Sequence, residues 1–434
     1  MLKVEQIIAP RYMERFQCIG PECEDNCCTD EWKILVDKEH YKKIEKAFSN
    51  KHLPREEFTK KFKRLRGAGT NDVRYAEIIH NNGNRCGLMT KDGLCELHAN
   101  YGSKILPDVC ATYPKLYNII RNRLEIYGTL SCPEVTRKCL LDDDALELVK
   151  IEPSEFRQNA LSTNLSSIDE DNYYEKHIDD IRTIITELLS LPNYNYEQKM
   201  FFVIFFIIRI NDHFHNKVTS DPANLLKDSI GYIKSQKGKN EVLSSIPQIS
   251  TKIGPAMHLV LKLFQTNFVK ASTSSTSPLN KFSSKILLSS LLSDLQPENQ
   301  QETLKASLEQ YNTVKKIISL EYKDNIEHYF TNYAINYWLG NCYTFSPDLV
   351  THTRKLLLKL ATIKFIFFSH PDIVNLSQSQ DIKGKEKTLN ETIVEVVYLF
   401  GRAFEHNQKR IDAMEEEIHK QNYGLPVLAS LLKF

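Results

Sequence analysis

Apolar residues recur three and four positions apart along most of the chain after residue 140, a spacing that predicts amphipathic helices. Segment 175–192 (EKHIDDIRTIITELLSLP) shows this spacing and stops at Pro192, where a helix is expected to end. Segment 196–215 is apolar on most sides, which predicts a buried helix. The same spacing predicts further helices at 222–235, 254–270, 284–294, 301–321, 324–339, 347–369, 390–406 and 408–421.

The first 140 residues follow a different pattern. Segment 37–66 predicts two short, highly charged helices that are broken near Pro54. Segment 73–80 (VRYAEIIH) predicts a short strand. Loops marked by glycine and proline make up much of the remainder, and such loops suit the display of ligands because they allow tight backbone bends.

These two patterns divide the chain. We predict a mainly α protein in which a cysteine-rich, metal-binding module of loops and short helices occupies residues 1–145. An all-α helical domain, or more than one, follows over residues 146–434. Polar, low-complexity sequence predicts a hinge near 271–283, with further linkers at 152–170 and 377–387.

Composition argues against several classes of protein. The 56 basic and 55 acidic residues nearly cancel, so no global field draws the chain to nucleic acid or to an anionic membrane. Only 15 of 434 residues are glycine, which counts against nucleotide-binding α/β folds. The longest apolar run, MFFVIFFII, falls far short of the ~20 residues of a membrane span. The start of the sequence has no signal-peptide pattern, so we expect a cytoplasmic protein.

Cysteine is the most informative residue type. Nine of the ten cysteines lie between Cys18 and Cys139, and Cys342 stands alone. The stretch CIGPECEDNCC places four thiols in eleven residues, and four more follow in NNGNRC, KDGLC, LPDVCATYP and SCP. The eight clustered cysteines are Cys18, Cys23, Cys27, Cys28, Cys86, Cys95, Cys110 and Cys132. Cys139 and Cys342 fit the ordinary burial of small apolar thiols.

Metal ligation explains the eight clustered thiols better than the alternatives do. Disulfides need an oxidising compartment, and no export signal is present. A catalytic thiol needs a base, and nothing singles out one of His40, His52, His80 and His98. Thiolates bind zinc or iron–sulfur clusters, and the sequence leaves both open. The segment from Cys95 to His98 offers a mixed pair for zinc, although a packed or solvated His98 fits as well.

At this point the sequence resembles a known family. CIGPECEDNCC, CGLMTKDGLCELHANYGSKILPDVCATYP and LSCPE are similar to the cysteine-rich module of the flagellin lysine-N-methylase family. The same module occurs in a broader class of zinc- or iron-chelating domains. The resemblance is specific over residues 10–140, and over the remainder it extends only to a helical part of similar length.

The resemblance implies an enzyme that transfers methyl groups from S-adenosylmethionine to lysine side chains of flagellin. It also implies a [4Fe-4S] cluster, with zinc as the alternative, held by four of the eight clustered cysteines. It does not identify the catalytic residues or the methyl-donor site. Tyr113, Pro114 and Tyr117 are candidates for a pocket wall, or alternatively for an aromatic shield over the metal. Trp32 leaves the same two alternatives. The acidic pair Asp30 and Glu31 is a candidate to face a substrate lysine, with a solvated surface as the alternative.

Two questions of mechanism and function stay open from the sequence. A radical C-x3-C-x2-C motif built on Cys23 and Cys27 would need a cysteine where Asp30 stands. Methylation of nitrogen requires no radical, because the amine carries a lone pair. The alternative function is a metal-stabilised binding or assembly protein that transfers no methyl group, in which the helices dock a partner.

Overall fold

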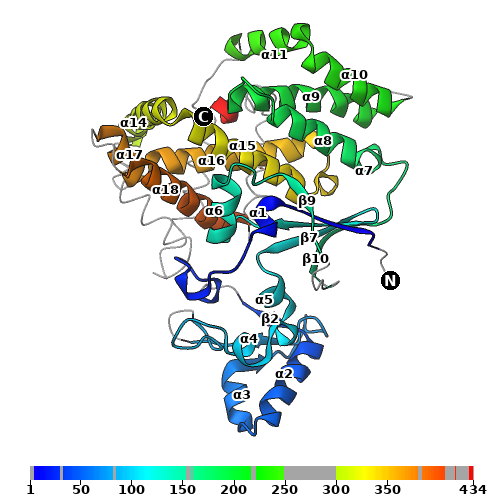
Figure 1. Cartoon of the computed structure of the whole chain (residues 1–434), viewed down its shortest axis with the longest axis vertical. Helices are drawn as coiled ribbons and strands as arrows, with labels where there is room; N and C mark the ends of the chain where they lie inside the picture. Colours follow the sequence, from blue (N-terminus) through cyan, green and yellow to red (C-terminus); the bar gives the residue numbers. More distant parts are fainter. Residues whose placement is uncertain are drawn as a thin grey trace.

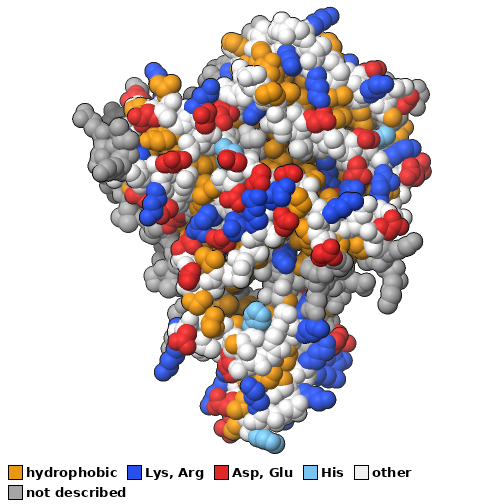
Figure 2. Space-filling view, in the orientation of Figure 1, with side chains coloured by type: hydrophobic (Ala, Val, Ile, Leu, Met, Phe, Trp, Pro, Cys, Tyr) orange, Lys and Arg blue, Asp and Glu red, His pale blue; other side chains and the backbone are white. Residues whose placement is uncertain are grey.

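The structure, a computed structural model, describes residues 4–29, 33–81, 85–152, 157, 160–216, 221–248, 300–379, 384–405, 416 and 430–433. Figure 1 shows a large helical body, a sheet below it, and a small lobe that projects beyond the sheet. Acidic and basic side chains mix over the face drawn in Figure 2, as the balanced composition leads one to expect. Within the described part of the chain, no helix has both the length and the apolar character that crossing a membrane requires.

Several predictions fall where the structure gives no description. The predicted helices at 254–270 and 284–294 and the predicted hinge near 271–283 lie outside the described residues. The predicted helix at 408–421 lies outside them except for residue 416. The same holds for Asp30, Glu31 and Trp32.

The helical body confirms the prediction of a mainly α protein. Predicted helices at 196–215, 222–235, 301–321, 324–339 and 347–369 are present, with ends within about two residues of the prediction. The helices of the body are α6 (Pro133–Leu141), α7 (Tyr173–Lys176), α8 (Ile178–Leu189), α9 (Tyr196–Asn216), α10 (Pro222–Lys234), α11 (Gln236–Gln248), α14 (Gln300–Glu321), α15 (Lys323–Gly340), α16 (Leu349–Ser369), α17 (Pro371–Gln378) and α18 (Lys385–Phe400).

Helix α15 lies at the centre of the body. It is buried on every side from Tyr329 to Gly340, and it packs against α6, α8 and α9. Helix α16 is buried over almost its whole length and packs against α9, α14 and α18. Asp348 caps α16, because its carboxylate accepts a hydrogen bond from the Thr351 backbone N–H. The two central helices therefore form a rigid platform.

A five-stranded sheet lies against this platform, and the sequence analysis did not predict it. The strands are β1 (Gln6–Pro10), β7 (Lys115–Ile120), β8 (Arg123–Gly128), β9 (Leu148–Lys150) and β10 (Leu161–Leu165), in the order β10-β7-β8-β1-β9. Strands β7 and β8 are buried on both faces over most of their length, so they lack the polar–apolar alternation that reveals a strand. The predicted linker at 152–170 contains β10, and the predicted boundary near residue 145 stays a prediction.

The small lobe has its own apolar core, gathered around Val36, Phe48, Phe58 and Phe62. The two predicted helices are α2 (Lys38–Asn50) and α3 (Arg55–Lys61), confirmed with Pro54 before the second. The lobe also contains α4 (Glu96–Tyr101), α5 (Asp108–Thr112) and the strands β2 (Leu35–Val36), β3 (Phe62–Arg64), β4 (Ala76–Ile78), β5 (His80–Asn81) and β6 (Arg85–Cys86). The strand predicted at 73–80 corresponds to β4 and the start of β5.

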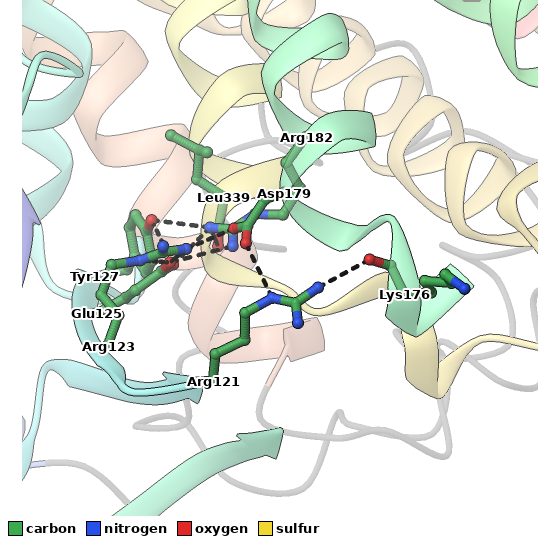
Figure 3. A network of polar contacts seen from close by, with 8 residues as sticks. All are labelled: Arg121, Arg123, Glu125, Tyr127, Lys176, Asp179, Arg182 and Leu339. Carbon is green, nitrogen blue, oxygen red and sulfur yellow. Dashed lines mark hydrogen bonds and ion pairs between the residues drawn. The ribbon is translucent and has the colours of Figure 1, made fainter. Parts of the chain in front are cut away.

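A buried ionic network joins the sheet to the helical body (Figure 3). Arg182 of α8 lies 2.6 Å from the Glu125 carboxylate of β8, and it also donates to the Leu339 carbonyl at 3.0 Å. The Arg182 and Glu125 side chains are only 7% and 1% exposed. Burial alone would raise the pKa of Glu125, but Arg182 and Arg123 together lower it. The pair therefore stays ionised inside the protein.

Removing one member of this pair leaves the other as an uncompensated buried charge. We expect Arg182→Met to lower the free energy of unfolding by about 3–5 kcal/mol. The matched control is Arg121→Met, since Arg121 belongs to the same network but is 41% exposed; it should cost less than about 1 kcal/mol. Chemical denaturation followed by circular dichroism measures both, and equal losses would contradict the assignment.

Candidate functional site

Five of the eight predicted ligand cysteines lie together in the small lobe, and we call them the thiol cluster: Cys27, Cys28, Cys86, Cys95 and Cys110. The short 3-10 turn Cys27–Thr29 packs against β6, which ends at Cys86. Cys28, Cys95 and Cys110 pack against the same small core that contains Cys86. The chain thus brings together thiols from three separate segments, at 27–28, 86–95 and 110.

The pKa values of these thiols reflect their proximity. The pKa of Cys28 is raised first by its hydrogen bond with Cys27, then by burial, and further by Cys86 and Cys110. Burial raises the pKa of Cys86 to about 11, and the neighbouring Cys95 and Cys27 raise it too. Burial and the neighbouring thiols thus both disfavour the thiolate forms of Cys28 and Cys86.

The other three predicted ligands are placed differently. Cys132 packs against the large core, and burial raises its pKa to about 12, with smaller contributions from Cys23 and Cys27. Cys23 is half-buried, and Cys18 is exposed. Cys132 therefore lies near enough to Cys23 and to Cys27 of the thiol cluster to interact electrostatically with both, whereas Cys18 lies at the surface.

Two histidines near these thiols differ in placement. His98 is exposed on α4. His80 pairs with Cys86 across β5 and β6, so the two side chains lie on the same face of the ladder. Within the described part of the chain, His80 Nε2 is buried without a hydrogen-bond partner. His80 thus lies beside Cys86 on one face of the ladder.

A cavity of about 840 Å³ opens beside the thiol cluster, between the sheet, α5, α15 and α16. Tyr113 and Pro114 line it, as one of the two sequence hypotheses held, while Tyr117 is buried in β7 and does not. The ionisable lining residues are mostly from the helical body: Asp108, Lys115, His352, Lys355, Lys359 and Glu405. Cys342 also lines the cavity, whereas the sequence predicted only ordinary burial for this thiol.

Helix α5 separates the thiol cluster from the cavity. Cys110 faces the small core, whereas Asp108, Val109 and Thr112 of the same helix line the cavity. Only about one turn of helix therefore lies between the two features. No local sequence signal marks this arrangement, because the cavity walls from α15, α16 and the turn of Glu405 come from residues more than 200 positions later.

Arg402 links the first cysteine segment, residues 18–28, to the helical body. It lies in the π-helical turn η7 (Gly401–Glu405), which directly follows α18. Its guanidinium lies 2.9 Å from the Asp25 carboxylate and donates to the backbone carbonyls of Asp25 and Ser131 at 2.6 and 3.0 Å. The Ser131 hydroxyl in turn lies 3.1 Å from the hydroxyl of Tyr113, on the cavity wall.

One further group of candidate ligand atoms occurs among the described residues, formed by Asp37, His40 and Asp108. The guanidinium of Arg157 donates to Asp108 at 2.9 Å and lies 3.1 Å from His40 Nε2. An arginine therefore already supplies the positive charge that these carboxylates require. We interpret the group as a structural link between α2 and α5.

Comparison with known proteins places the chain in a family. A family model described as the FliB lysine N-methylase C-terminal domain matches residues 182–432. A lysine-N-methylase of Salmonella typhimurium (strain LT2) is 29% identical over 149 residues, 34% of this chain and 35% of the relative. The flagellar biosynthetic protein FliU of Salmonella muenchen is 28% identical over 149 residues, 34% of this chain and 84% of the relative. A lysine-N-methylase of Salmonella choleraesuis (strain SC-B67) is 28% identical over 149 residues, 34% of this chain and 35% of the relative.

These alignments have a limited extent. The chain spans about a third of the length of the lysine-N-methylases that it matches. No solved structure matches the chain. The family model, however, covers more than half of the chain and includes α15, α16 and the turn that carries Arg402. The chain therefore belongs to the FliB lysine N-methylase family.

Proposed function

We propose that this protein methylates lysine side chains of flagellin with S-adenosylmethionine, in the cavity beside the thiol cluster. The observation that carries the proposal is the position of α5, which presents Cys110 to the thiols and three other residues to the cavity. Family membership supplies the class of reaction, namely transfer of a methyl group to a lysine nitrogen. The cytoplasm, where flagellin is made, is the expected site of action.

The cavity suits this chemistry in size and character. A volume of about 840 Å³ lies in the range of small-molecule sites, so it has room for a methyl donor and a lysine side chain. At its edge, Phe345 and Val109 are 68% and 40% exposed. Exposed apolar side chains at the mouth of a cavity favour a protein substrate over a small free amine.

The lysine must react as a neutral amine. Its nitrogen lone pair forms the new N–C bond while the C–S bond of the sulfonium breaks, which leaves a methylammonium and a neutral thioether. His352 reports on the electrostatics of the cavity, because burial, with Lys359 and Lys355, lowers its pKa to about 3. Burial and two neighbouring cations would lower the pKa of an incoming lysine in the same way.

The thiol cluster fits a metal centre in its chemistry. Sulfur donors from separate segments suit a soft metal, and binding would release the protons that the crowded thiols hold. The four sulfurs of one tetrahedral zinc lie about 3.8 Å apart, given a Zn–S distance of ~2.3 Å. Among the described cysteines, no three sulfurs come within 4.8 Å of one another, so the preference for a [4Fe-4S] cluster over zinc rests on the resemblance of the cysteine-rich sequence.

In this proposal the ligands are drawn from the thiol cluster, and the centre holds α5 and the loop of Cys27 and Cys28 in place. Cys132, Cys23 and Cys18 remain candidates from the sequence, and His80 Nε2 is a nitrogen alternative. The role proposed for the centre is to fix the wall of the cavity. No step of the methyl transfer is assigned to it.

The direct test incubates purified protein with flagellin and a labelled methyl donor. Wild-type protein should label lysine. Ser162→Trp, which fills the cavity from the exposed face of β10, should reduce labelling by about tenfold or more. The matched control is Ser166→Trp, an exposed serine just beyond the same strand, which should leave labelling unchanged. Absence of label with the metal centre intact would refute the proposal.

Metal content tests the ligand assignment. After anaerobic purification we expect iron and sulfide in equal amounts, and Cys110→Ser and Cys95→Ser should lose most of both. Cys139→Ser and Cys342→Ser should keep them, because Cys139 is fully buried in the large core and Cys342 lies across the cavity. Zinc in place of iron would overturn the cluster assignment. Equal loss in all four variants would overturn the division of the cysteines.

A further inference from the structure

A lysine of the protein itself occupies a small polar site in the wall of the cavity. Lys359 of α16 lines the cavity and is almost fully buried. Its Nζ lies 2.8 Å from Glu405 Oε1 and 5.0 Å from the centre of the Tyr337 ring. The hydroxyl of Tyr333 lies 3.5 Å from the same Glu405 oxygen. A carboxylate and an aromatic face around one ammonium group make a recognition site for alkylammonium ions.

The turn that carries Glu405 gives this site a fixed position. Glu405 is the last residue of the π-helical turn Gly401–Glu405, and it lies three residues after Arg402. Gly401 approaches the backbone of Ser131 so closely that an added Cβ would lie 3.0 Å from it. Turns of this kind occur often at functional sites. The contacts that hold the cysteine segment therefore also set the place of the Glu405 carboxylate.

We propose that Glu405, with Tyr333 and Tyr337, binds the side-chain ammonium group of the substrate lysine as it enters the cavity, before it loses its proton and reacts, and that Lys359 fills this subsite until the substrate displaces it. The inference rests on the proposed function, because the cavity must be the place where lysine reacts. Lys359 and the substrate carry the same functional group, so one can replace the other without leaving Glu405 unpaired. The displaced Lys359 stays nearby as a second cation beside Lys355.

The other charged groups of the cavity support this choice of subsite. Asp108 is engaged by Arg157 at 2.9 Å on the α5 side, so its charge is already balanced. Lys115, Lys355 and the neutral His352 do not attract an ammonium ion. The described lining residues include two carboxylates, and Glu405 is the one that pairs with a lysine amine, that of Lys359.

The test measures binding of N-acetyl-lysine methylamide to the full-length, metal-loaded protein by calorimetry, with the norleucine analogue as the uncharged control. Lys359→Met removes the internal competitor and should tighten binding by about tenfold, the gain expected if the subsite is filled ~90% of the time. Glu405→Gln should weaken binding by about tenfold or more. Lys364→Met, at a buried lysine of α16 that does not line the cavity, is the matched control and should change binding by less than ~3-fold.

Opposite effects of the two variants distinguish a binding site from a merely structural ion pair. A structural pair predicts that Lys359→Met and Glu405→Gln both lose stability and that neither tightens binding. Lys359→Gln, which keeps a hydrogen-bond donor for Glu405, serves if the methionine variant does not fold. Binding no tighter than in the Lys364→Met control, or equal binding of the norleucine analogue, overturns the proposal. Because flagellin labelling is a separate measurement, loss of the subsite and loss of the methylase function are distinguishable.

Discussion

The ion pair of Arg402 with Asp25, together with its hydrogen bonds to the Asp25 and Ser131 carbonyls, is the interaction on which the rest of the site depends. A guanidinium whose side chain is 3% exposed is stable only where every nearby acceptor is well placed, because desolvation of a charge is costly. Arg402 meets that condition with one carboxylate and two backbone carbonyls. These contacts tie the helical body, through the end of α18, to the first cysteine segment and to the loop that precedes Cys132.

Two short elements, the turn Gly401–Glu405 and helix α5, each reach both the cysteine region and the cavity. The turn Gly401–Glu405 carries Arg402 to the cysteine segment and Glu405 to the cavity. Helix α5 carries Cys110 to the thiol cluster and Asp108 to the cavity. The thiol cluster and the cavity therefore share their supports. A structural change among the cysteines is therefore expected to affect the cavity wall, because only one turn of α5 separates them. The buried pair of Arg182 and Glu125 adds rigidity, because it fixes the sheet that forms the cavity floor (Figure 3).

Sequence periodicity was sufficient for the helices and insufficient for the sheet. The apolar face of a helix repeats within one segment, so α9, α14, α15 and α16 could be predicted. Strands β7 and β8 are buried on both faces, and their partners β1 and β10 lie far away in the sequence. Nothing in a single strand of this kind distinguishes it from buried helix. The fold was therefore predictable in its helical class and not in the element that supports the cavity.

The candidate site divides in the same way. Cysteine spacing pointed to a metal centre, and the structure brings Cys27, Cys28, Cys86, Cys95 and Cys110 together while placing Cys18 at the surface. Tyr113 and Pro114 were candidates for the pocket wall, because they follow a cysteine closely. Nothing in the sequence marked Arg402, Lys359 or Glu405 as functional residues. A charged residue in an amphipathic helix is usually solvated, and its partner here lies tens or hundreds of residues away.

The central claim is that the cavity beside the thiol cluster holds the methyl donor. Photo-crosslinking of labelled S-adenosylmethionine to the metal-loaded protein, followed by peptide mapping, tests it most directly. The account predicts label in the peptides that line the cavity, at 108–116, 128–130, 333–346 or 352–359. It also predicts that excess S-adenosylhomocysteine abolishes that label. Specific label confined to α10, α11 or α17, none of which lines the cavity, would contradict it.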